Sequence, residues 1–342
     1  MRFAWVRSYA DFKFISLISL LACGFCSCTA ITSSPEPLLN AAVPLAIPTY
    51  DGSGQLVEPD VIFFNTPWRG FQYWMAFSPY PFTNPEDENP SVVVSNDGVN
   101  WQVPDGLVNP IVQADGTNYL SDASIFYDSA SDQLWVYYNV ALGSPGTPGV
   151  ALGINRAVSS DGVHWTNDGQ LFQVPNCDAV SPTVGKVGDN YFMWSVDPAD
   201  CSAPTSVMTY RTSSDGLNWS DPLATDLVQP GYVVWHINVN HVPSKNEWWT
   251  AVTAFPSGQD CCANTRLFFS DSPDGIHWNS YSKPILSASA SGWDSSQIYR
   301  STFLFDAGTN GIQVWYSAAN PQAWHVGYTQ ENYDEFIAWL RE

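Results

Sequence analysis

The segment Ser95-Asn96-Asp97-Gly98-Val99-Asn100-Trp101 decides the fold, because its pattern Ser-x-Asp-Gly-x-x-Trp recurs along the chain. The further copies are residues 159–165, 213–219 and 272–278, and successive copies of the tryptophan are 54 to 64 residues apart. An Asp-Gly step favours a tight turn, since glycine accepts a positive φ and aspartate bonds the turn backbone. The spacing indicates one structural unit repeated along the chain.

Two apolar, β-rich runs precede each copy, and a fifth pair of runs lacks the turn that follows the others. The first runs of the five units begin at Val61, Ser124, Thr183, Ile237 and Thr302. This pattern predicts an all-β fold, a five-bladed β-propeller of four-stranded antiparallel blades. We expect the unit without a turn to be a terminal blade, closed by a strand from residues 49–56, and one amphipathic helix over residues 332–340.

The N-terminus has the pattern of an export signal. Basic residues precede an apolar run over residues 14–22, which is too short to span a bilayer. Leu20-Leu21-Ala22-Cys23-Gly24 then resembles the lipobox of bacterial lipoproteins, so a lipidated Cys23 would attach the chain to a membrane; ordinary secretion is the alternative. We expect a signal peptide at 1–28, a tether at 29–48, a propeller at 49–342, and an exported protein, secreted or lipid-anchored at the cell surface.

Seven cysteines suit an exported chain. Cys177 and Cys201 could close a loop. Cys261 and Cys262 are adjacent, and a bond between them would stiffen a loop tip; they could instead pair with other cysteines or stay free. Apart from Cys23-Gly24-Phe25-Cys26 in the predicted signal peptide, no Cys-x-x-Cys pattern occurs in the sequence, which disfavours a structural zinc site.

The composition points to a neutral, polar ligand. The 342 residues include 33 acidic and 12 basic side chains, so the formal net charge is −21. Nucleic acid is a poor partner for a chain with so few basic residues, and phosphate-handling enzymes are disfavoured for the same reason. The 16 tryptophans and 16 tyrosines suit a carbohydrate, whose C–H faces stack on aromatic rings. We expect a monomer.

Candidate site residues stand where the predicted inner strands begin, because the first strand of each propeller blade lines the central channel. One polar side chain opens each of these strands, at intervals of 56 to 64 residues: Asp60, Asp122, Asp178, His236 and Arg300. Carboxyl groups crowded in a channel raise one another's pKa, so that one stays protonated for acid catalysis while another is ionised.

Five blades with an aspartate at the head of the first and second inner strands resemble five-bladed glycoside hydrolases, the family 43-like arabinanase, levansucrase and invertase group, and within it uncharacterised exported members. The resemblance implies that Asp60 is the general base and that Asp122 orients the acid. The family's third-blade glutamate, two residues before a proline, is absent, since Val180 stands there before Pro182. Asp178 is the substitute we expect as general acid.

Other residues at these strand heads are candidates for substrate binding. Glu58 is a second acid, and His236 and Arg300 could contact hydroxyl or carboxylate groups. The non-functional interpretations are a channel-lining His236 bonded to water, an Arg300 paired with Asp60 and Asp122, and aspartates that bond strand backbone. The complete set of substrate-binding candidates is Glu58, Trp68, Trp235, His236, Tyr299 and Arg300.

The sequence therefore predicts a glycoside hydrolase that acts on a furanose- or pentose-containing glycan through carboxylate acid and base groups. The alternative from another class is a non-catalytic, surface glycan-binding propeller. A sialidase would need an arginine cluster and a phosphorolytic enzyme several basic groups, which the inner strands do not supply. We expect no cofactor and no metal ligand set; a calcium ion in the channel is left open as an alternative, although no ligand motif supports it.

Overall fold

A computed structural model describes residues 38–142, 152–174, 178–198 and 205–342. The predicted signal peptide, Cys23, Cys177 and Cys201 lie outside the described residues. Residues 36–342 form one compact unit. Within the described ranges, no helix has the length and apolarity that crossing a membrane requires.

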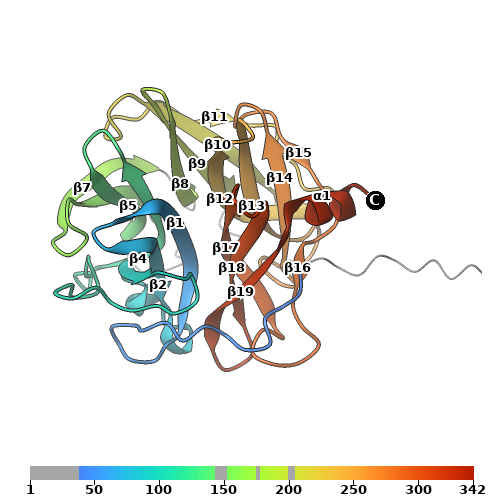
Figure 1. The fold of residues 1–342 in the computed structure, drawn as a ribbon, viewed down its shortest axis with the longest axis horizontal. Helices are drawn as coiled ribbons and strands as arrows, with labels where there is room; N and C mark the ends of the chain where they lie inside the picture. Colours follow the sequence, from blue (N-terminus) through green and yellow to red (C-terminus); the bar gives the residue numbers. More distant parts are fainter. Residues whose placement is uncertain (1–37, 143–151, 175–177, 199–204) are drawn as a thin grey trace, which may run out of the picture. The chain divides into compact units, whose positions relative to one another are not determined.

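Five antiparallel sheets follow one another along the chain and surround a common axis, which confirms the five-bladed β-propeller (Figure 1). Their strands are β1 (Leu56–Trp68), β2 (Phe71–Pro79) and β3 (Ser91–Ser95) in the first blade; β4 (Asn118–Asp128), β5 (Gln133–Leu142), β6 (Leu152–Ser159) and β7 (Thr166–Val174) in the second; β8 (Val180–Val187), β9 (Asn190–Pro198), β10 (Ser206–Ser213) and β11 (Leu223–Ala224) in the third; β12 (Tyr232–Val242), β13 (Glu247–Pro256), β14 (Arg266–Ser272), β15 (Asn279–Ser280) and β16 (Leu286–Ser287) in the fourth; β17 (Gln297–Asp306), β18 (Gly311–Ala319) and β19 (Trp324–Asn332) in the fifth.

The prediction of four strands per blade is correct for the second and third blades only. The fourth blade has a further short strand, β16, beside β14, and the first and fifth blades have three strands. In the first blade the outer position holds a single bridge, between Val94 and Gln102. In the fifth blade the Leu45 N–H donates to the Val326 carbonyl of β19 at 2.8 Å.

The closing segment is therefore earlier in the chain than residues 49–56, which corrects that prediction. Residues 38–47 run along the fifth blade, where Leu38 is 1% exposed and Ile47 is 3% exposed. Both side chains belong to hydrophobic clusters of the propeller. Apolar residues in this segment thus give it a packed position, although its Ala and Pro content resembles that of a tether.

The repeated Ser-x-Asp-Gly-x-x-Trp segments form the turns expected of them. In the first copy the Asp97 carboxylate accepts the N–H groups of Val99 and Asn100 at 2.9 and 2.7 Å, and the Ser95 hydroxyl oxygen accepts that of Gly98 at 2.9 Å. The other three copies make the same bonds. Each glycine has a φ between +69° and +78°, a conformation that favours glycine.

Each turn glycine also packs against a tryptophan or its neighbour in the preceding blade. A Cβ atom at Gly162 would lie 2.1 Å from the ring of Trp74, and one at Gly275 would lie 2.6 Å from that of Trp194. Gly216 and Gly98 meet Trp135 and Trp315 in the same way. The Trp194 and Trp315 indoles additionally donate to the carbonyl of the glycine they meet, both at 2.7 Å. The repeat therefore joins neighbouring blades as well as turning the chain.

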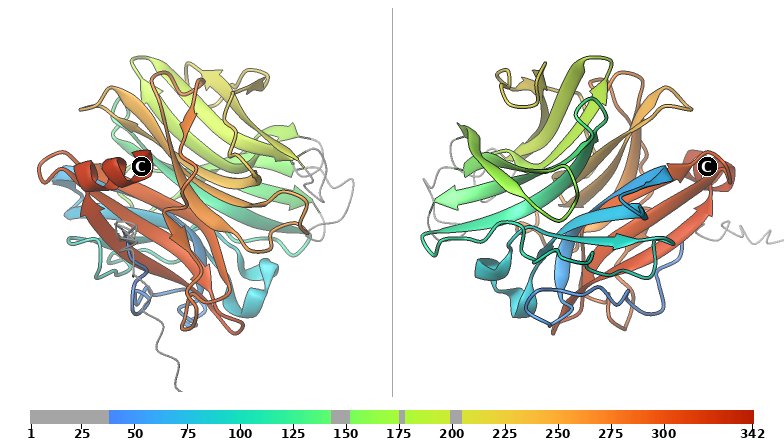
Figure 2. Two further views of the ribbon diagram at one scale, coloured as in Figure 1. Left: turned by 90° about the vertical axis from the view of Figure 1, so that its right-hand side faces the viewer. Right: turned by 60° about the vertical axis from the view of Figure 1, so that its left-hand side comes forward.

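The helix α1 (Tyr333–Arg341) takes the place of the turn that the fifth blade lacks, and it confirms the predicted helix. Asn332 caps it by accepting the N–H groups of Asp334 and Glu335. The ring of Tyr333 stacks on Trp249 of the fourth blade, with centroids 4.7 Å apart and planes inclined by 10°. Figure 2 shows α1 beside these two blades. All five interfaces between blades thus contain a second-strand tryptophan.

Gly162→Ala tests the close contact between turn and tryptophan. The added methyl group must displace Trp74, and overpacking of this kind costs about 1–3 kcal/mol. The control is Gly169→Ala, since Gly169 has a similar φ of +80° but no neighbouring atom within 4 Å of the added Cβ. Urea unfolding should show the larger loss for Gly162→Ala. Equal losses would mean that backbone strain alone explains the glycine.

Candidate functional site

The inner strands β1, β4, β8, β12 and β17 all carry an irregularity in their pairing close to their first residues. In the first three strands the shift spans Val57/Asp60, Ser121/Ser124 and Val180/Thr183. An inserted residue bends a strand and re-aims a side chain. Glu58, Asp122 and Ser181 occupy the matching positions, with φ of 59°, 57° and 56°.

The bulges correct the register inferred from sequence spacing. Glu58, rather than Asp60, is the first-blade counterpart of Asp122. Asp60 pairs two residues further along β1, where it matches Ser124. Positive φ at residues other than glycine costs free energy and is concentrated at functional sites. The conformations of Glu58, Asp122 and Ser181 therefore indicate a functional site at the strand heads.

Asp122 is the centre of a buried polar network. Its Oδ1 atom accepts the N–H and the hydroxyl of Ser181 at 3.1 and 3.0 Å, and it lies 3.4 Å from Nδ1 of His236. Glu58 Oε2 accepts the N–H of Asp122 at 2.7 Å and the hydroxyl of Ser78 at 2.9 Å. The first, second, third and fourth blades thus meet in one cluster.

The hydrogen bonds of Ser181 determine which ring nitrogen of His236 carries the proton. Ser181 has one hydroxyl proton, which it donates in a hydrogen bond to the Asp122 carboxylate, because an ionised carboxylate can only accept. The 2.6 Å contact between Ser181 Oγ and His236 Nδ1 then requires Nδ1 to be the donor. Neutral His236 is left with a lone pair on Nε2, the form in which imidazole binds a metal ion.

Two atoms of this cluster lack hydrogen-bond partners although they are buried: Glu58 Oε1 and His236 Nε2. One oxygen of Glu58, one oxygen of Asp122 and a ring nitrogen of His236 lie within 4.8 Å of one another. Buried polar atoms are normally satisfied, so such a pair calls for a missing partner. Two carboxylate oxygens and an imidazole nitrogen are a suitable ligand set for a divalent transition metal, which the sequence did not predict.

Burial and neighbouring charge set the proton affinities of the three groups. Burial raises the pKa of Glu58 to about 8, with a further contribution from the negative charge of Asp122. Burial also acts on Asp122, but hydrogen bonding and charge from His236, followed by the charge of Arg300, lower its pKa. Burial lowers the pKa of His236. The cluster therefore holds one ionised carboxylate beside a neutral imidazole.

Arg300 lies beneath this cluster at the propeller axis and is fully buried. Its guanidinium group donates to the carbonyls of Ile237, Ala123 and Pro182 at 3.1 to 3.3 Å, and its Nη1 is 3.6 Å from Asp122. It thus ties β17 to β12, β4 and β8. The predicted ion pair exists with Asp122, and no ion pair with Asp60 occurs among the described residues.

Asp60 belongs to a separate network deeper in the channel. Its Oδ2 atom accepts the hydroxyl of Ser124 at 2.6 Å and the N–H of Ile125 at 2.9 Å, and its Oδ1 accepts the amide of Asn238 at 2.9 Å. Thr302 is a further donor. These are the backbone and side-chain bonds of a structural strand-head carboxylate, the non-functional interpretation of this residue.

Asp178 and Trp68 lie away from the cluster. Asp178 is partly exposed, precedes β8, and has the charges of Asp197 and Arg211 as its electrostatic neighbours. Trp68 ends β1, and its indole donates to Asp132 at 2.6 Å while its ring packs against Trp74. The structure therefore brings together Glu58, Asp122, His236 and Arg300, but not Asp60, Asp178 and Trp68.

Comparisons with known proteins agree with this architecture, although no family model matches the chain. A curated A-type blood N-acetyl-α-D-galactosamine deacetylase of Flavonifractor plautii is 28% identical over 354 residues, covering 83% of this chain. The chain spans 45% of that relative's length. The crystal structure of an N-acetylgalactosamine deacetylase from F. plautii, in complex with blood group B trisaccharide, superposes with a TM-score of 0.78 at 26% identity, covering 89% of this chain and 97% of that one.

The fold is that of carbohydrate-active enzymes. A family GH43 endo-arabinanase from Bacillus licheniformis is 13% identical, with a TM-score of 0.52 over 81% of this chain and 93% of that one. At this identity the likeness concerns the fold alone, which is the fold that the resemblance to glycoside hydrolases implied. These structural neighbours support a glycan-acting enzyme fold.

Aromatic rings surround the strand heads, and they include two of the predicted stacking residues. Trp235 lies 4.4 Å from the His236 ring and 4.8 Å from that of Tyr299, measured between centroids. Tyr299 continues to Trp324 at 5.3 Å, and Trp324 to Tyr80 at 5.9 Å. Tyr80 and Trp324 were not predicted, because no repeat position marks them. Tyr80 directly follows β2, and Trp324 is the first residue of β19.

Glu88 is a further acidic group that sequence reasoning did not assign to the site. It follows the 3₁₀ turns Pro81–Thr83 and Pro85–Asp87 in the loop between β2 and β3 and is buried. Burial, followed by the charges of Glu58 and Asp122, raises its pKa well above the ordinary value. Its neighbour Asn89 holds the loop by bonding the N–H of Ala114 and the hydroxyl of Tyr50. The available signal was the acidic run Glu86-Asp87-Glu88.

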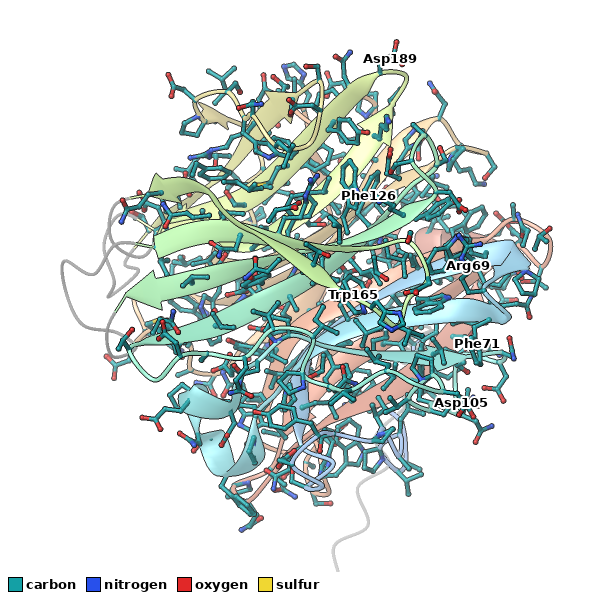
Figure 3. All side chains as sticks on the ribbon, turned by 90° about the vertical axis from the view of Figure 1, so that its left-hand side faces the viewer. Arg69, Phe71, Asp105, Phe126, Trp165 and Asp189 are labelled. Atoms are coloured by element: carbon teal, nitrogen blue, oxygen red, sulfur yellow. A yellow bond between two sulfur atoms is a disulfide. The ribbon has the colours of Figure 1, made fainter. Side chains whose placement is uncertain are left out.

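Arg300→Met tests whether the axial arginine supports the site. Removing one partner from a buried charge network costs about 3–5 kcal/mol, because Asp122 and three carbonyl groups lose a donor or counter-charge. The control is Arg69→Met, because Arg69 (labelled in Figure 3) forms an exposed ion pair with Asp132 of the second blade, and such pairs contribute little. Urea unfolding should separate the two variants clearly, and a similar small loss in both would contradict the assignment.

Proposed function

We propose that this protein is a hydrolase that removes the acetyl group from an N-acetylated amino sugar of a glycan, with a divalent metal ion held by Glu58, Asp122 and His236. The observation that carries the proposal is the convergence of these three side chains within 4.8 Å, with Glu58 Oε1 and His236 Nε2 buried and unpartnered. The relatedness to a deacetylase over 83% of the chain supports the choice of reaction.

The donor set favours a transition metal over the calcium ion considered from the sequence. Calcium takes six to eight oxygen ligands, whereas imidazole nitrogen suits zinc, manganese and related ions. The Ser181 hydroxyl fixes the orientation and tautomer of His236 from behind, as hydrogen-bonding partners of metal-binding histidines do. Hydrogen bonds from Ser78 and from the Asp122 N–H orient Glu58 in the same manner.

The surroundings of the carboxylates favour an amide over a glycosidic bond as the point of attack. Glycosidic cleavage needs two carboxyl groups on either side of the sugar. Glu58 instead bonds the Asp122 backbone and converges with Asp122 on His236. Asp60 is occupied by hydrogen-bond donors, and Asp178 lies elsewhere. The predicted action on furanose- or pentose-containing glycans through Asp60, Asp122 and Asp178 has less support.

Each group has a role in the proposed reaction. A divalent metal ion held by Glu58, Asp122 and His236 would supply Lewis acidity towards the amide carbonyl and towards water. Glu88, a buried carboxyl group whose pKa is raised by burial and by the charges of Glu58 and Asp122, accepts a proton from water in this proposal and delivers it to the amine nitrogen. A C–O bond forms, the amide C–N bond breaks, and acetate and the free amino sugar result. His236, followed by Arg300, lowers the pKa of Asp122, and the aromatic rings hold the sugar face.

The test measures acetate release from a trisaccharide that ends in N-acetyl-α-galactosamine. Glu58→Gln and His236→Gln each remove a proposed metal ligand, so kcat/KM should fall by about 100-fold or more, and EDTA should abolish activity until zinc or manganese is restored. Asp178→Asn is the matched acidic control and should stay within about twofold of the parent, because Asp178 lies outside the cluster.

Two other outcomes would contradict the proposal. New reducing ends that disappear in Asp178→Asn and persist in EDTA would identify a glycoside hydrolase. Trisaccharide binding without release of acetate or of reducing ends, under every metal condition, would identify a glycan-binding propeller. Thermal unfolding of each variant shows whether a lost activity reflects a lost fold.

A further inference from the structure

The turn at residues 257–264 joins β13 to β14 at the end of the fourth blade where β12 begins. Tyr232, the first residue of β12, pairs with Pro256, which directly precedes this turn. Across the gap to the fifth blade, the Gln297 side chain donates to the Cys262 carbonyl at 2.9 Å. The turn therefore lies beside the heads of two inner strands, on the side of the propeller where Glu58, Asp122 and His236 meet.

A disulfide between the adjacent residues Cys261 and Cys262 closes this turn. Of the alternatives that the sequence left open, this is the pairing found among the described residues. Cys262 and Asn264 have φ of 75° and 54°, in a region that residues other than glycine rarely adopt. Covalent closure holds the turn in this conformation, and strain of this kind is concentrated at ligand-binding positions.

The disulfide continues the aromatic surface around the strand heads. Cys261 and Trp235 both pack against Val233 and Phe255, and Trp235 leads on to His236 and Tyr299. Both cysteines are partly exposed. Two adjacent sulfur atoms present a polarizable surface with no hydrogen-bond donor, which suits contact with C–H groups rather than with hydroxyls.

Trp235 contacts both this surface and the polar groups of the site, since it packs with Cys261 against Val233 and Phe255 and its ring lies 4.4 Å from that of His236. Glu58, Asp122 and His236 offer the carboxylate and imidazole groups for the reacting amide, whereas the disulfide offers none. A ligand that contacts both regions meets polar groups at one end and an apolar surface at the other. Its reacting unit lies at the polar cluster, and the apolar C–H face of the next unit lies against Trp235 and the disulfide.

We propose that the Cys261–Cys262 disulfide and Trp235 form a subsite for the sugar linked to the reacting amino sugar, so that the substrate is an oligosaccharide. This inference rests on the proposed function, since the reacting unit is placed at the Glu58–Asp122–His236 cluster. It assigns to the turn a role in specificity, separate from the chemistry.

The double variant Cys261→Ser/Cys262→Ser tests the subsite. It replaces the apolar sulfur pair by hydroxyl groups of similar size. Acetate release is measured with two probes, free N-acetylgalactosamine and a trisaccharide that ends in N-acetyl-α-galactosamine. The parent should prefer the trisaccharide by about tenfold in kcat/KM. The variant should raise KM for the trisaccharide about fivefold, by more than for the monosaccharide, with a smaller effect on kcat.

Gln259→Ala is the matched control, because it removes the turn's hydrogen bond with Asn264 and keeps the disulfide; it should retain the trisaccharide preference. Equal losses on both probes, or a fall in kcat alone, would show that the disulfide only supports the fold and would overturn the inference. If the parent protein releases no acetate, the proposed function fails. The subsite is then tested separately, by calorimetric titration of the parent and the double variant with the trisaccharide. Weaker binding by the double variant then supports the subsite, and equal or absent binding refutes it.

Discussion

The contact between a turn glycine and an indole ring of the preceding blade holds the ring of sheets together. It occurs at Gly98, Gly162, Gly216 and Gly275, and α1 supplies the equivalent contact with Trp249 at the remaining interface. Interfaces of this kind fix the angle between blades. The inner strands therefore begin at one end of the axis in a constant arrangement, and the polar residues at their heads converge.

That convergence buries charged side chains near the propeller axis. They lie at different depths, in layers that differ in their hydrogen bonds. In one layer, Arg300 donates hydrogen bonds to carbonyl groups of three inner strands and lies 3.6 Å from Asp122. Asp60 lies in a separate layer and is bonded by Ser124 and Asn238. No buried side-chain nitrogen or oxygen of Arg300 or Asp60 lacks a hydrogen-bond partner, which indicates a structural role for these two layers. The layer with Glu58 and His236 retains unpartnered atoms, and this difference distinguishes the proposed reactive layer from the layers that support it.

The sequence predicted the fold and part of the site. The Asp-Gly turns and their spacing predicted five blades. The expectation that site residues stand at the beginnings of the inner strands identified Glu58, Asp122, His236 and Arg300. Spacing could not reveal the bulges, because an inserted residue changes register without changing composition; Asp60 was therefore matched with Asp122 in place of Glu58. Glu88 was missed because a loop outside the repeat delivers it, held by Asn89. The proposed metal ligand set depends on unpartnered atoms, which only three-dimensional contacts show.

The claim that these strand heads form one metal-dependent centre has a direct test. Crystals of the protein soaked in manganese, measured by anomalous X-ray diffraction, should show a peak bounded by the carboxylates of Glu58 and Asp122 and by Nε2 of His236. The peak should disappear in crystals of His236→Gln. Full-occupancy peaks only at surface carboxylates, with none between these three side chains, would contradict the account.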